Sequence, residues 1–512
     1  MRDCPARFHS MWVPLRSALP LGFILLGLTG CATVGPNFRS PEAPAVDRYT
    51  HARLPDHTRA TPNMPQGDSQ HYVASKQAPV EWWQMFHNAP LNALVAQGLN
   101  TSPTLAAAEA KFRQAQQTFA AQSGSTELPQ VNGKLSAQSQ GINNSAFGQP
   151  GGKRSFELYN AGLTVSYNLD LFGANRRALE ALAAQTDYQH YALNAARLTL
   201  AGNIVIQAIT QAMLNEQIST TQAIIHAQQD QLDLVRQRLK LGAATRGDEL
   251  TLQTQIQQTR ATLPPLNTKR SQANHLLATL TGQMPGAANI PQFTLADFTL
   301  PASVPVVVPS EWVRARPDIQ ASEALLHAAT AQYGVAVADL YPQINLSGTL
   351  GSQSISPQKL FTPDSLIWSL LSGLTQPIFN GGLKAGKDAA HEALSAAAAN
   401  YQQTVLDGLR NVADVLQASA NDADTLAAQA AAEQSARESL SLVEQQLKLG
   451  SANYLQLLIA QQQAAQTRLL TLAARAQRLT DTVALYQAMG GGTQAAQAPM
   501  AKNKSTAQTP TP

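Results

Sequence analysis

Four segments of this 512-residue chain alternate apolar and polar side chains with a period of two, the pattern of β-strands. These segments are residues 131–141, 155–171, 343–352 and 366–379. In the second of them, Leu163, Val165 and Tyr167 fall on one face. Stretches rich in glycine, asparagine, serine and proline, residues 141–154 and 351–364, separate the members of each pair. The pattern predicts two β-hairpins with long loops, a motif that soluble proteins also contain.

The segments that follow the hairpins predict two very long helices. Residues 177–240 and 384–448 each run for about 65 residues without proline, and as α-helices they would be about 95 Å long. Each ends at a Leu-Gly pair, with Gly242 or Gly450 able to adopt the left-handed conformation that closes a helix. Beyond each glycine a second helix is expected to return, so that two helical hairpins point the same way.

The whole arrangement occurs twice, because the chain repeats itself. Residues 234–242 match residues 442–450 at an offset of 208, and residues 128–131 match residues 341–344 at an offset of 213. Each repeat opens with a further helix, rich in alanine, glutamine and leucine, that ends at a proline. These helices are expected over residues 91–122 and 311–340. Matched segments in the same order indicate an internal duplication.

The repeats and the composition divide the chain into six segments. Proline-rich stretches before and between the repeats are typical of extended connections, and the C-terminal segment has no apolar periodicity. The expected segments are a lipoprotein signal peptide (1–30), a lipidated extended arm (31–80), repeat 1 (81–282), a connector (283–310), repeat 2 (311–492) and a disordered tail (493–512).

The N-terminus resembles a bacterial lipoprotein signal. Basic residues precede a short apolar run, residues 19–28, and small residues lead to Cys31. In such signals the cysteine becomes the first residue of the mature protein and carries a covalent lipid, so Cys31 is the expected lipidation site. Ala32 follows it in place of the aspartate that often means inner-membrane retention, which favours the outer membrane. The alternative is an ordinary secretory signal with a chance cysteine.

Cleavage before Cys31 would change the composition in ways that bear on function. Because Cys4 lies in the signal, no disulfide could form within the mature chain. The formal net charge would fall from +3 to about +1, which argues against nucleic acid as a partner. Only 13% of residues are charged and 6% are aromatic, a composition that suits closely packed long helices. We find no apolar run after Cys31 long enough for a spanning helix, so a membrane crossing is expected to use β-strands.

Two motifs resemble binding or catalytic sites, and each lacks a required residue. Residues 381–387 spell most of a phosphate-binding loop, but Asp388 stands where a serine or threonine should bind magnesium. His391 and Glu392 begin a zinc-protease motif, but Ser395 replaces its second histidine. We therefore expect no enzyme activity, no catalytic residue, no metal site and no cofactor apart from the lipid on Cys31.

Taken together, these features resemble the TolC-like outer-membrane efflux lipoproteins of the OprM or NodT type. The resemblance rests on the lipoprotein signal, on the repeat of β-hairpin plus long helices, and on short motifs. The motifs are Trp82-Trp83 with Phe86 and Leu91, Arg316-Pro317-Asp318-Ile319, Tyr341-Pro342, and Gly450 with Asn453-Tyr454-Leu455. The resemblance covers nearly the whole mature chain.

The resemblance implies a mixed α/β membrane protein that is lipid-anchored in the outer membrane and extends into the periplasm. Four strands cannot close a barrel alone, since single-chain barrels have at least eight. The family implies a homotrimer with a 12-stranded β-barrel, continued by a long periplasmic α-helical barrel. It further implies a passive exit duct for drugs or other small molecules, working with a periplasmic adaptor protein and an inner-membrane pump.

Two other functions remain open from the sequence. The first is a lipid-anchored periplasmic coiled-coil scaffold without a pore, in which the β-hairpins pack against protein. The second is an anchored periplasmic enzyme, for which the sequence offers no site. The exported solute and the partner pump are not readable from the chain.

In relatives the tunnel closes at its periplasmic tip, which the resemblance places at two turns, residues 242–247 and 450–454. Arg246, Asp248 and Tyr454 are polar candidates in or beside these turns. They are therefore the candidate residues of the periplasmic aperture.

One departure from the family concerns an acidic residue that relatives often carry just after the second turn. Here Ser451, Ala452 and Ile459 occupy that region, so an acidic ring from this repeat is not expected. Asp248 and Glu249 in the first repeat are the nearest acids, although either could be an ordinary solvated helix residue.

Overall fold

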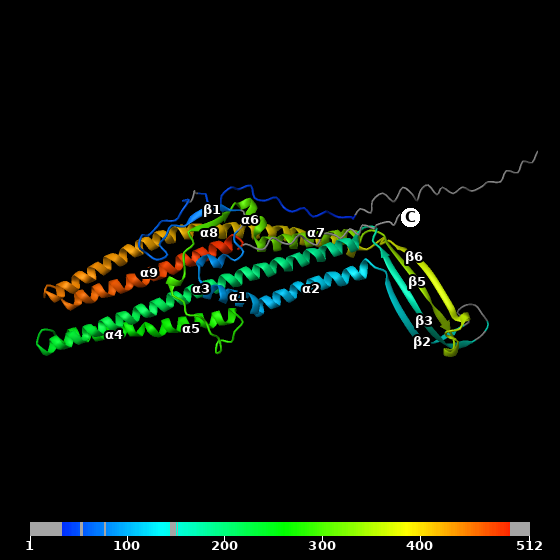
Figure 1. The fold of residues 1–512 in the computed structure, drawn as a ribbon. Coiled ribbons are helices and arrows are strands. Elements are labelled where there is room, and N and C mark those ends of the chain that lie inside the picture. Colours follow the sequence, from blue (N-terminus) through cyan, green and yellow to red (C-terminus); the bar gives the residue numbers. More distant parts are fainter. Residues whose placement is uncertain (1–32, 52–54, 76–77, 144–149, 151, 492–512) are drawn as a thin grey trace, which may run out of the picture. The chain divides into compact units, whose positions relative to one another are not determined.

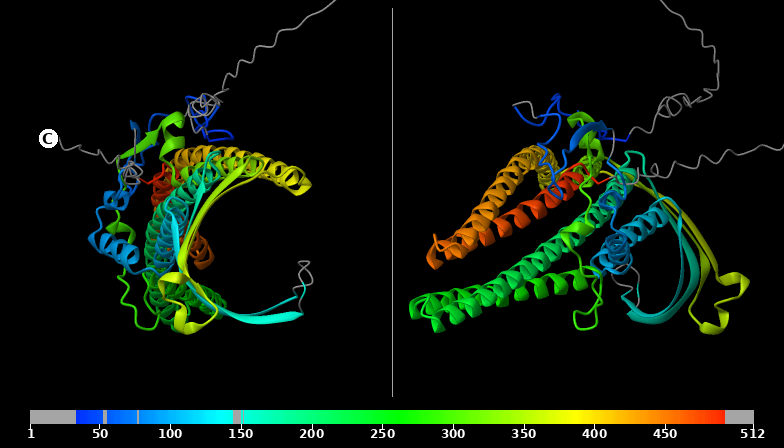
Figure 2. Two further views of the ribbon diagram at one scale, coloured as in Figure 1. Left: turned by 90° about the vertical axis from the view of Figure 1, so that its right-hand side faces the viewer. Right: turned by 60° about the vertical axis from the view of Figure 1, so that its left-hand side comes forward.

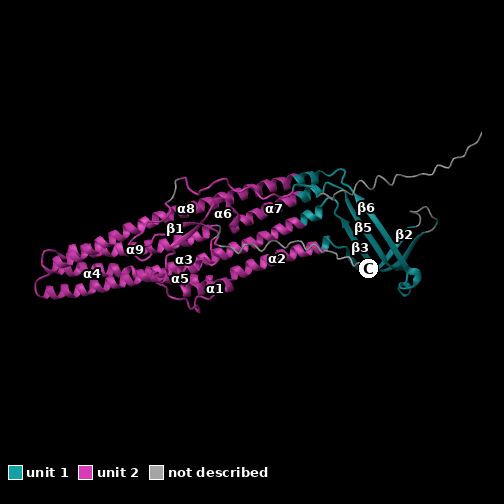
Figure 3. Cartoon of the chain, turned by 45° about the horizontal axis from the view of Figure 1, so that its top comes forward, with its two compact units in different colours: residues 1–36, 125–178, 334–387 teal, residues 37–124, 179–333, 388–512 magenta. Residues whose placement is uncertain are grey.

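The structure is a computed structural model that describes residues 33–51, 55–75, 78–143, 150 and 152–491. The chain divides into two compact units (Figure 3). Unit 1 comprises residues 1–36, 125–178 and 334–387, and unit 2 comprises residues 37–124, 179–333 and 388–512. The predicted signal peptide, Cys31 and the predicted disordered tail all lie outside the described residues.

Unit 1 is built on one antiparallel sheet with the strand order β2-β3-β5-β6, which Figure 2 shows as a curved layer. The strands are β2 (Gln130–Asn143), β3 (Lys153–Leu169), β5 (Gln343–Ser354) and β6 (Leu366–Thr375). All four predicted strands are confirmed, and the register between them is continuous. The last strand ends at Thr375, earlier than predicted, because Pro377 has no N–H to donate to a ladder. Two short 3₁₀ turns, Pro357–Lys359 and Pro363–Ser365, lie in the loop between β5 and β6.

The first described residues are fixed within unit 1, where strand β3 gives way to helix. The amide of Val34 donates to the carbonyl of Phe172 at 3.1 Å. Gly35 lies so close to Gly334 that a Cβ on Gly35 would be 2.7 Å from the Cα of Gly334. Arg177 donates to the carbonyl of Gly35 at 3.3 Å. The chain is therefore held in place a few residues after the predicted lipidation site.

Most of unit 2 consists of long helices that run side by side (Figures 1 and 3). The two longest, α3 (Ala174–Lys240) and α8 (Gly381–Lys448), have 67 and 68 residues and confirm the two predicted long helices. From α8 the chain returns through α9 (Tyr454–Ala488). From α3 it returns through α4 (Arg246–Ala261) and α5 (Leu263–Leu280).

Three helices that we predicted as continuous are each divided in two at a proline. The observed pairs are α1 (Ala89–Thr101) with α2 (Pro103–Thr126), α4 with α5, and α6 (Pro309–Ala315) with α7 (Pro317–Ala338). Pro103, Pro264 and Pro317 fall in the first two positions of the second helix of each pair. A proline is tolerated there because the first N–H groups of a helix have no intrahelical acceptor, whereas it disrupts a helix interior. The prediction of single helices was wrong because these prolines were not treated as breaks.

A second, small sheet joins the predicted arm to the predicted connector inside unit 2. It pairs β1 (His71–Ser75) with β4 (Ser303–Val307) in parallel. No strand was predicted in either segment, because five-residue strands with no local partner carry little periodic signal. Buried Arg478 of α9 fastens the arm further, donating to the carbonyls of Gln66 at 2.7 Å and Asp68 at 3.1 Å. The arm is thus part of the packed unit.

The main apolar core of unit 2 contains the aromatic motif that the sequence analysis singled out. Trp82 and Phe86, in the 3₁₀ helix Trp82–Phe86, are fully buried together with Leu91. The ring of Trp82 stacks on Tyr486 of α9 with 5.5 Å between centroids. Large aromatic side chains contribute heavily to core packing, so this motif stabilises the junction between α1 and α9.

One expectation about membrane segments needs correction. Helix α3 contains an 18-residue window with a mean hydropathy of 1.2, which is long and apolar enough to cross a membrane by length and composition alone. The window is not an uninterrupted apolar run, so the sequence did not predict it as a span. The buried share of this window is 44%, and the core helix of a soluble protein passes the same test, so the window is weak evidence for a span.

Candidate functional site at the helical tips

Two helical hairpins form the elongated part of unit 2. Hairpin 1 is made of α3 and α4, and hairpin 2 is made of α8 and α9. Both turn at the same end of unit 2 (Figures 1 and 2). Gly242 and Gly450 occupy the turns with φ of 75° and 78°, the left-handed conformation that the sequence predicted. At each turn the amide after the glycine donates to the carbonyl five residues earlier, at 2.8 Å in hairpin 1 and 2.9 Å in hairpin 2. Both long helices therefore close with the same C-terminal motif.

Each return helix begins with a capping box. In hairpin 1 the carboxylate of Asp248 accepts from the amide of Thr245 at 2.8 Å, and the hydroxyl of Thr245 accepts from the amide of Asp248 at 3.1 Å. In hairpin 2 the side chains of Asn453 and Gln456 exchange the equivalent bonds with each other's amides, both at 2.9 Å. The position of Asp248 is thus set by its role in starting α4.

Arg246, the second candidate aperture residue, reaches a buried carboxylate. Glu249 accepts hydrogen bonds from Arg246, from Nε of Arg236 at 3.0 Å and from Gln253 at 3.1 Å. Its side chain is 7% exposed, so the interpretation of Glu249 as a solvated helix residue is wrong. The hydrogen bond from Arg236 is the main cause that lowers the pKa of Glu249 below its usual range.

Tyr454, the third candidate, lies where the two hairpins meet. Its side chain packs against a buried apolar cluster in hairpin 1. The cluster consists of Leu232, Val235, Leu252 and Ile256. The hydroxyl of Tyr454 is buried and finds no hydrogen-bond partner among the described residues. Of the three candidates, Tyr454 makes the contact between hairpins, while Arg246 and Asp248 share the first turn of α4.

Hairpin 2 buries a carboxylate along its shaft instead of at its turn. The side chain of Glu433 on α8 is 4% exposed, and one of its oxygens accepts from Arg437 of the same helix and from Arg468 of α9, the latter at 3.0 Å. Nearby, Gln461 of α9 donates to Gln231 of α3 at 2.7 Å. A cavity of about 330 Å³ lies between α3, α8 and α9 at this level. The two hairpins are therefore joined by polar contacts here and by apolar contacts at the tip.

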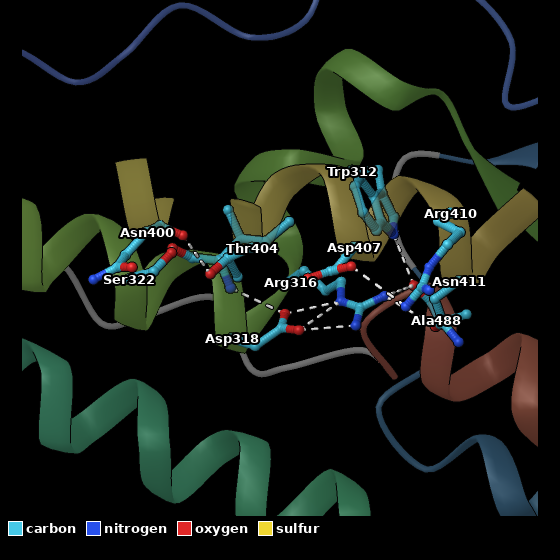
Figure 4. Close-up of polar contacts among 11 residues, drawn as sticks. Trp312, Arg316, Asp318, Ser322, Asn400, Thr404, Asp407, Arg410, Asn411 and Ala488 are labelled. Carbon is cyan, nitrogen blue, oxygen red and sulfur yellow. Dashed lines mark hydrogen bonds and ion pairs between the residues drawn. The ribbon is translucent and has the colours of Figure 1, made fainter. Parts of the chain in front are cut away.

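The Arg316-Pro317-Asp318 motif joins three helices away from the helical tips, near the end of α9 (Figure 4). Arg316 makes a two-pronged contact with Asp318, with shortest distances of 2.8 Å. It also donates to Asn411 of α8 at 3.2 Å and to the carbonyl of Ala488 at the end of α9 at 3.3 Å. The indole N–H of Trp312 donates to the same carbonyl at 2.7 Å. The motif thus ties the start of α7 to the end of α9, and its part is structural.

The sheet of unit 1 has one apolar and one polar face. Directly opposite residues in an antiparallel register share a face, and this assigns eight large apolar side chains, 53% to 80% exposed, to one side. These are Val131, Leu135, Leu163, Leu350, Leu366, Trp368, Leu370 and Leu374. The other side carries mostly glutamine, asparagine, serine and threonine. Alternation of this kind is the pattern of strands that face lipid on one side and water on the other.

Nothing in the described part of the chain groups three or more His, Cys, Asp or Glu side chains in a way that could hold a metal ion. Cys31 and the lipid expected on it lie outside the described residues. The main features of the described residues are the two faces of the unit 1 sheet, the cavity between α3, α8 and α9, and the turns of the two hairpins. Surfaces of these kinds suit the passage of a solute or the docking of a protein partner.

Sequence reasoning named Glu249 as an acid beside the turn but did not predict its burial, and it did not single out Glu433. The burial of Glu249 could have been expected from the turn itself, because Arg236 and Glu249 lie at similar distances on either side of it. Glu433 and its partner Arg468 are 35 residues apart, and only the pairing of α8 with α9 brings them together. Single charged residues on long helices look the same in a sequence whether they are solvated or buried.

Comparison with known proteins places the chain in a family. The family model for outer membrane efflux protein matches residues 94–283 and 308–491, one match for each repeat. The chain is 30% identical to nodulation protein T of Rhizobium leguminosarum bv. viciae, over 91% of each chain. It is 28% identical to outer membrane protein OprJ of Pseudomonas aeruginosa, over 93% of this chain and 96% of that protein.

Solved structures agree with this match. The outer-membrane channel OprN superposes with a TM-score of 0.81 at 26% identity, over 90% of this chain and 99% of that one. These findings confirm the predicted resemblance to TolC-like efflux proteins, the predicted fold class, the outer-membrane location and the function as an efflux channel component. The matched relatives are channel and transport proteins. With the family model covering both repeats, the chain belongs to the outer membrane efflux protein family.

Proposed function

We propose that three copies of this chain assemble into one channel with a shared 12-stranded barrel. In the described sheet β2 and β6 are the edge strands, each paired on one side. Unpaired backbone groups cost several kcal/mol each in lipid, so an open edge cannot persist there. Three sheets joined edge to edge leave no edge open. The observation that carries the proposal is the exposed apolar face of unit 1, which belongs against lipid while the polar face lines the lumen.

The long helices of unit 2 then wall a periplasmic tunnel, and the protein acts as a passive exit duct for small molecules. It performs no catalysis and draws its energy from an inner-membrane pump, to which a periplasmic adaptor protein connects it. The support for these partners is the family, whose members are efflux proteins. The support for a tunnel is the pair of helices of 67 and 68 residues, far longer than a globular core needs.

Purified mature protein in mild detergent tests this proposal. Light scattering should give three times the mass of one chain, and single molecules inserted in planar bilayers should conduct ions until heating dissociates the trimer. The alternative, a lipid-anchored coiled-coil scaffold without a pore, would give a folded oligomer that never conducts. That outcome would contradict the proposed channel.

The closed end of the tunnel lies at the two helical turns, with Arg246, Asp248 and Tyr454 as its polar residues. Replacing Tyr454→Ala together with Asp248→Ala should raise the conductance, because it removes the apolar contact between hairpins and frays the start of α4. Tyr454→Phe is the matched control, since it removes only a buried hydroxyl without a described partner. A folded double variant with unchanged conductance would place the constriction at Leu455 and Ile459.

A covalent lipid on Cys31 anchors the arm. Its support is the signal pattern and the clamp that unit 1 places on Val34 and Gly35, which would bring an acyl chain close to the sheet. Radiolabelled palmitate should enter the wild type and not Cys31→Ser. Equal labelling of both would rule the assignment out.

A further inference from the structure

The polar face of the unit 1 sheet carries charge of only one sign. We call it the lumenal face, and it comprises the even-numbered residues of β2 and β3 and the odd-numbered residues of β5 and β6. Among the described residues of these strands, the charged side chains on this face are Lys134 and Arg154. Neither aspartate nor glutamate occurs on it within the same described strands. Most of its remaining side chains are amides and hydroxyls. The apolar exceptions are Ile142 on β2, Phe156 and Leu158 on β3, and Ile367 and Leu371 on β6.

Lys134 lies in the middle of β2 and is exposed. The residue opposite it is Gly162, which in turn pairs with Gly351 on β5. The two glycines approach so closely that a Cβ on Gly162 would lie 2.9 Å from the Cα of Gly351. The two positions beside Lys134, on β3 and β5, therefore have no side chain. This leaves room for the long side chain of Lys134 to extend over the face.

The nearest neighbours of Lys134 on the lumenal face are uncharged. Along β2 they are Asn132 and Ser136, and diagonally across on β3 they are Asn160 and Thr164. Arg154 adds a second positive charge near the far end of the same strand pair, opposite Ile142. Cationic groups lining a confined passage without acids raise the local concentration of anions and lower that of cations.

We propose that the barrel lumen favours anionic solutes, such as those carrying carboxylate, phosphate or sulfonate groups, and that Lys134 is the residue that sets this preference. The inference rests on the trimeric barrel of the proposed function, in which three copies supply a ring of three Lys134 side chains and a second ring of Arg154. A solute leaving the cell passes these rings last. The barrel therefore adds a charge filter that is separate from the helical tips.

A local measurement separates this filter from any effect of the tips on ion flow. Ser136→Cys places a thiol two residues from Lys134 on the same face, with little change in size. Two methanethiosulfonate reagents of similar size, one with a sulfonate group and one with a trimethylammonium group, are then added to the purified trimer. The quantity measured is the ratio of the anionic to the cationic reaction rate. Any effect of Lys134 on thiol ionisation changes both rates equally and cancels.

In the Ser136→Cys background, Lys134→Gln should lower this ratio by roughly threefold to tenfold at 0.1 M salt or below, and the difference should shrink at 1 M salt. Lys134→Glu should lower it further. Lys134→Arg should restore the wild-type ratio, which a purely structural role would not require. Lys359→Gln is the matched control, because it removes the same charge from the loop between β5 and β6.

Two results would overturn the inference, and they differ in what they say about the proposed function. If both reagents react with the trimer and the ratio is the same with Lys134 and Lys134→Gln, the charge filter is wrong and the channel stands. If neither reagent reacts with the trimer while both react with the unfolded chain, Ser136 does not face water, and the barrel itself is wrong.

Discussion

Hairpin 1 and hairpin 2 share their turns and differ in where they bury charge. In hairpin 1 the buried carboxylate of Glu249 lies four residues after Thr245, directly beside the turn. In hairpin 2 the first buried carboxylate, Glu433, lies more than four helical turns before Gly450. From residue 445 to residue 480 hairpin 2 contains no acid, and its second buried carboxylate is Asp481.

This difference separates the features of a duplicated hairpin that depend on neighbouring residues from those that depend on the partner helix. The glycine turn and the capping box depend on a few neighbouring residues, and both repeats keep them. Buried charge depends on the partner helix, and the repeats differ there. Hairpin 1 is therefore fixed by charge at its tip and hairpin 2 along its shaft. Between the two tips, the contact is apolar and comes from Tyr454, which packs on the buried cluster of hairpin 1.

The largest expected difference between the hairpins is a dependence of the stability of hairpin 2 on pH. Asp481 is 6% exposed, and burial, followed by the effect of the neighbouring Asp422 carboxyl on α8, raises its pKa to about 7. Gln477 donates to it at 2.8 Å, and Arg478 and Tyr72 are the other polar groups near it. A carboxyl group with a raised folded pKa holds its proton more tightly in the folded state. Its contribution to the free energy of unfolding is therefore present at low pH and is lost as the pH rises from about 4 to about 7.

We expect the contact between α8 and α9 to lose up to about 4 kcal/mol across this range. Hydrogen exchange of amides in α8 and α9 near Asp481, corrected for intrinsic rates, should show protection falling between pH 5 and pH 7.5. Asp481→Asn should abolish this slope. Asp424→Asn, on the exposed side of α8, is the control and should keep it. A wild-type protein with no slope would contradict the prediction.

A smaller effect concerns the buried carboxylate of the shaft. Glu433→Gln keeps the shape but removes the charge that Arg437 and Arg468 bind, and should cost about 2 kcal/mol. Both arginines reach solvent, which limits the loss. Exchange protection should fall along the shafts of α8 and α9 and not at the tip of hairpin 1. Glu438→Gln, exposed on the same helix, should change stability by less than about 0.5 kcal/mol.

The equivalent substitution in hairpin 1 should affect hydrogen exchange at the tip and not along the shaft. Glu249→Gln should reduce protection at the first turn of α4, beside Arg236 and Arg246, and leave the shaft of hairpin 2 unchanged. If both variants loosened the same amides, the two hairpins would behave as one unit. The proposed division between tip and shaft would then be wrong.

The smallest effect tests the feature that the hairpins share. Thr245→Ala and Asn453→Ala each remove an N-cap, and each should cost about 1 kcal/mol, because both capping boxes have the same hydrogen bonds. Thermal unfolding of the trimer measures both variants. A loss confined to one hairpin would show that the two turns are not equivalent, despite their matching geometry.

The amino-acid sequence alone predicts the elements whose cause is local. Alternation with a period of two located the four strands, because each residue of a strand shows its face by its position alone. Gly242 and Gly450 located the turns, because few other residues adopt a positive φ at low cost. The breaks at Pro103, Pro264 and Pro317 were equally local, and they were missed only because helical composition was given more weight than proline.

Which polar residues are buried, and what they bind, depends on how distant parts of the chain pack together. Glu249, Glu433 and Asp481 occur in stretches that look like solvated helix, and the strand pairing of His71–Ser75 with Ser303–Val307 spans more than 200 residues of chain. The free energy of such a group depends on which distant side chain lies beside it and on how much water remains. Those quantities belong to the packing between helices, and no window of sequence contains them.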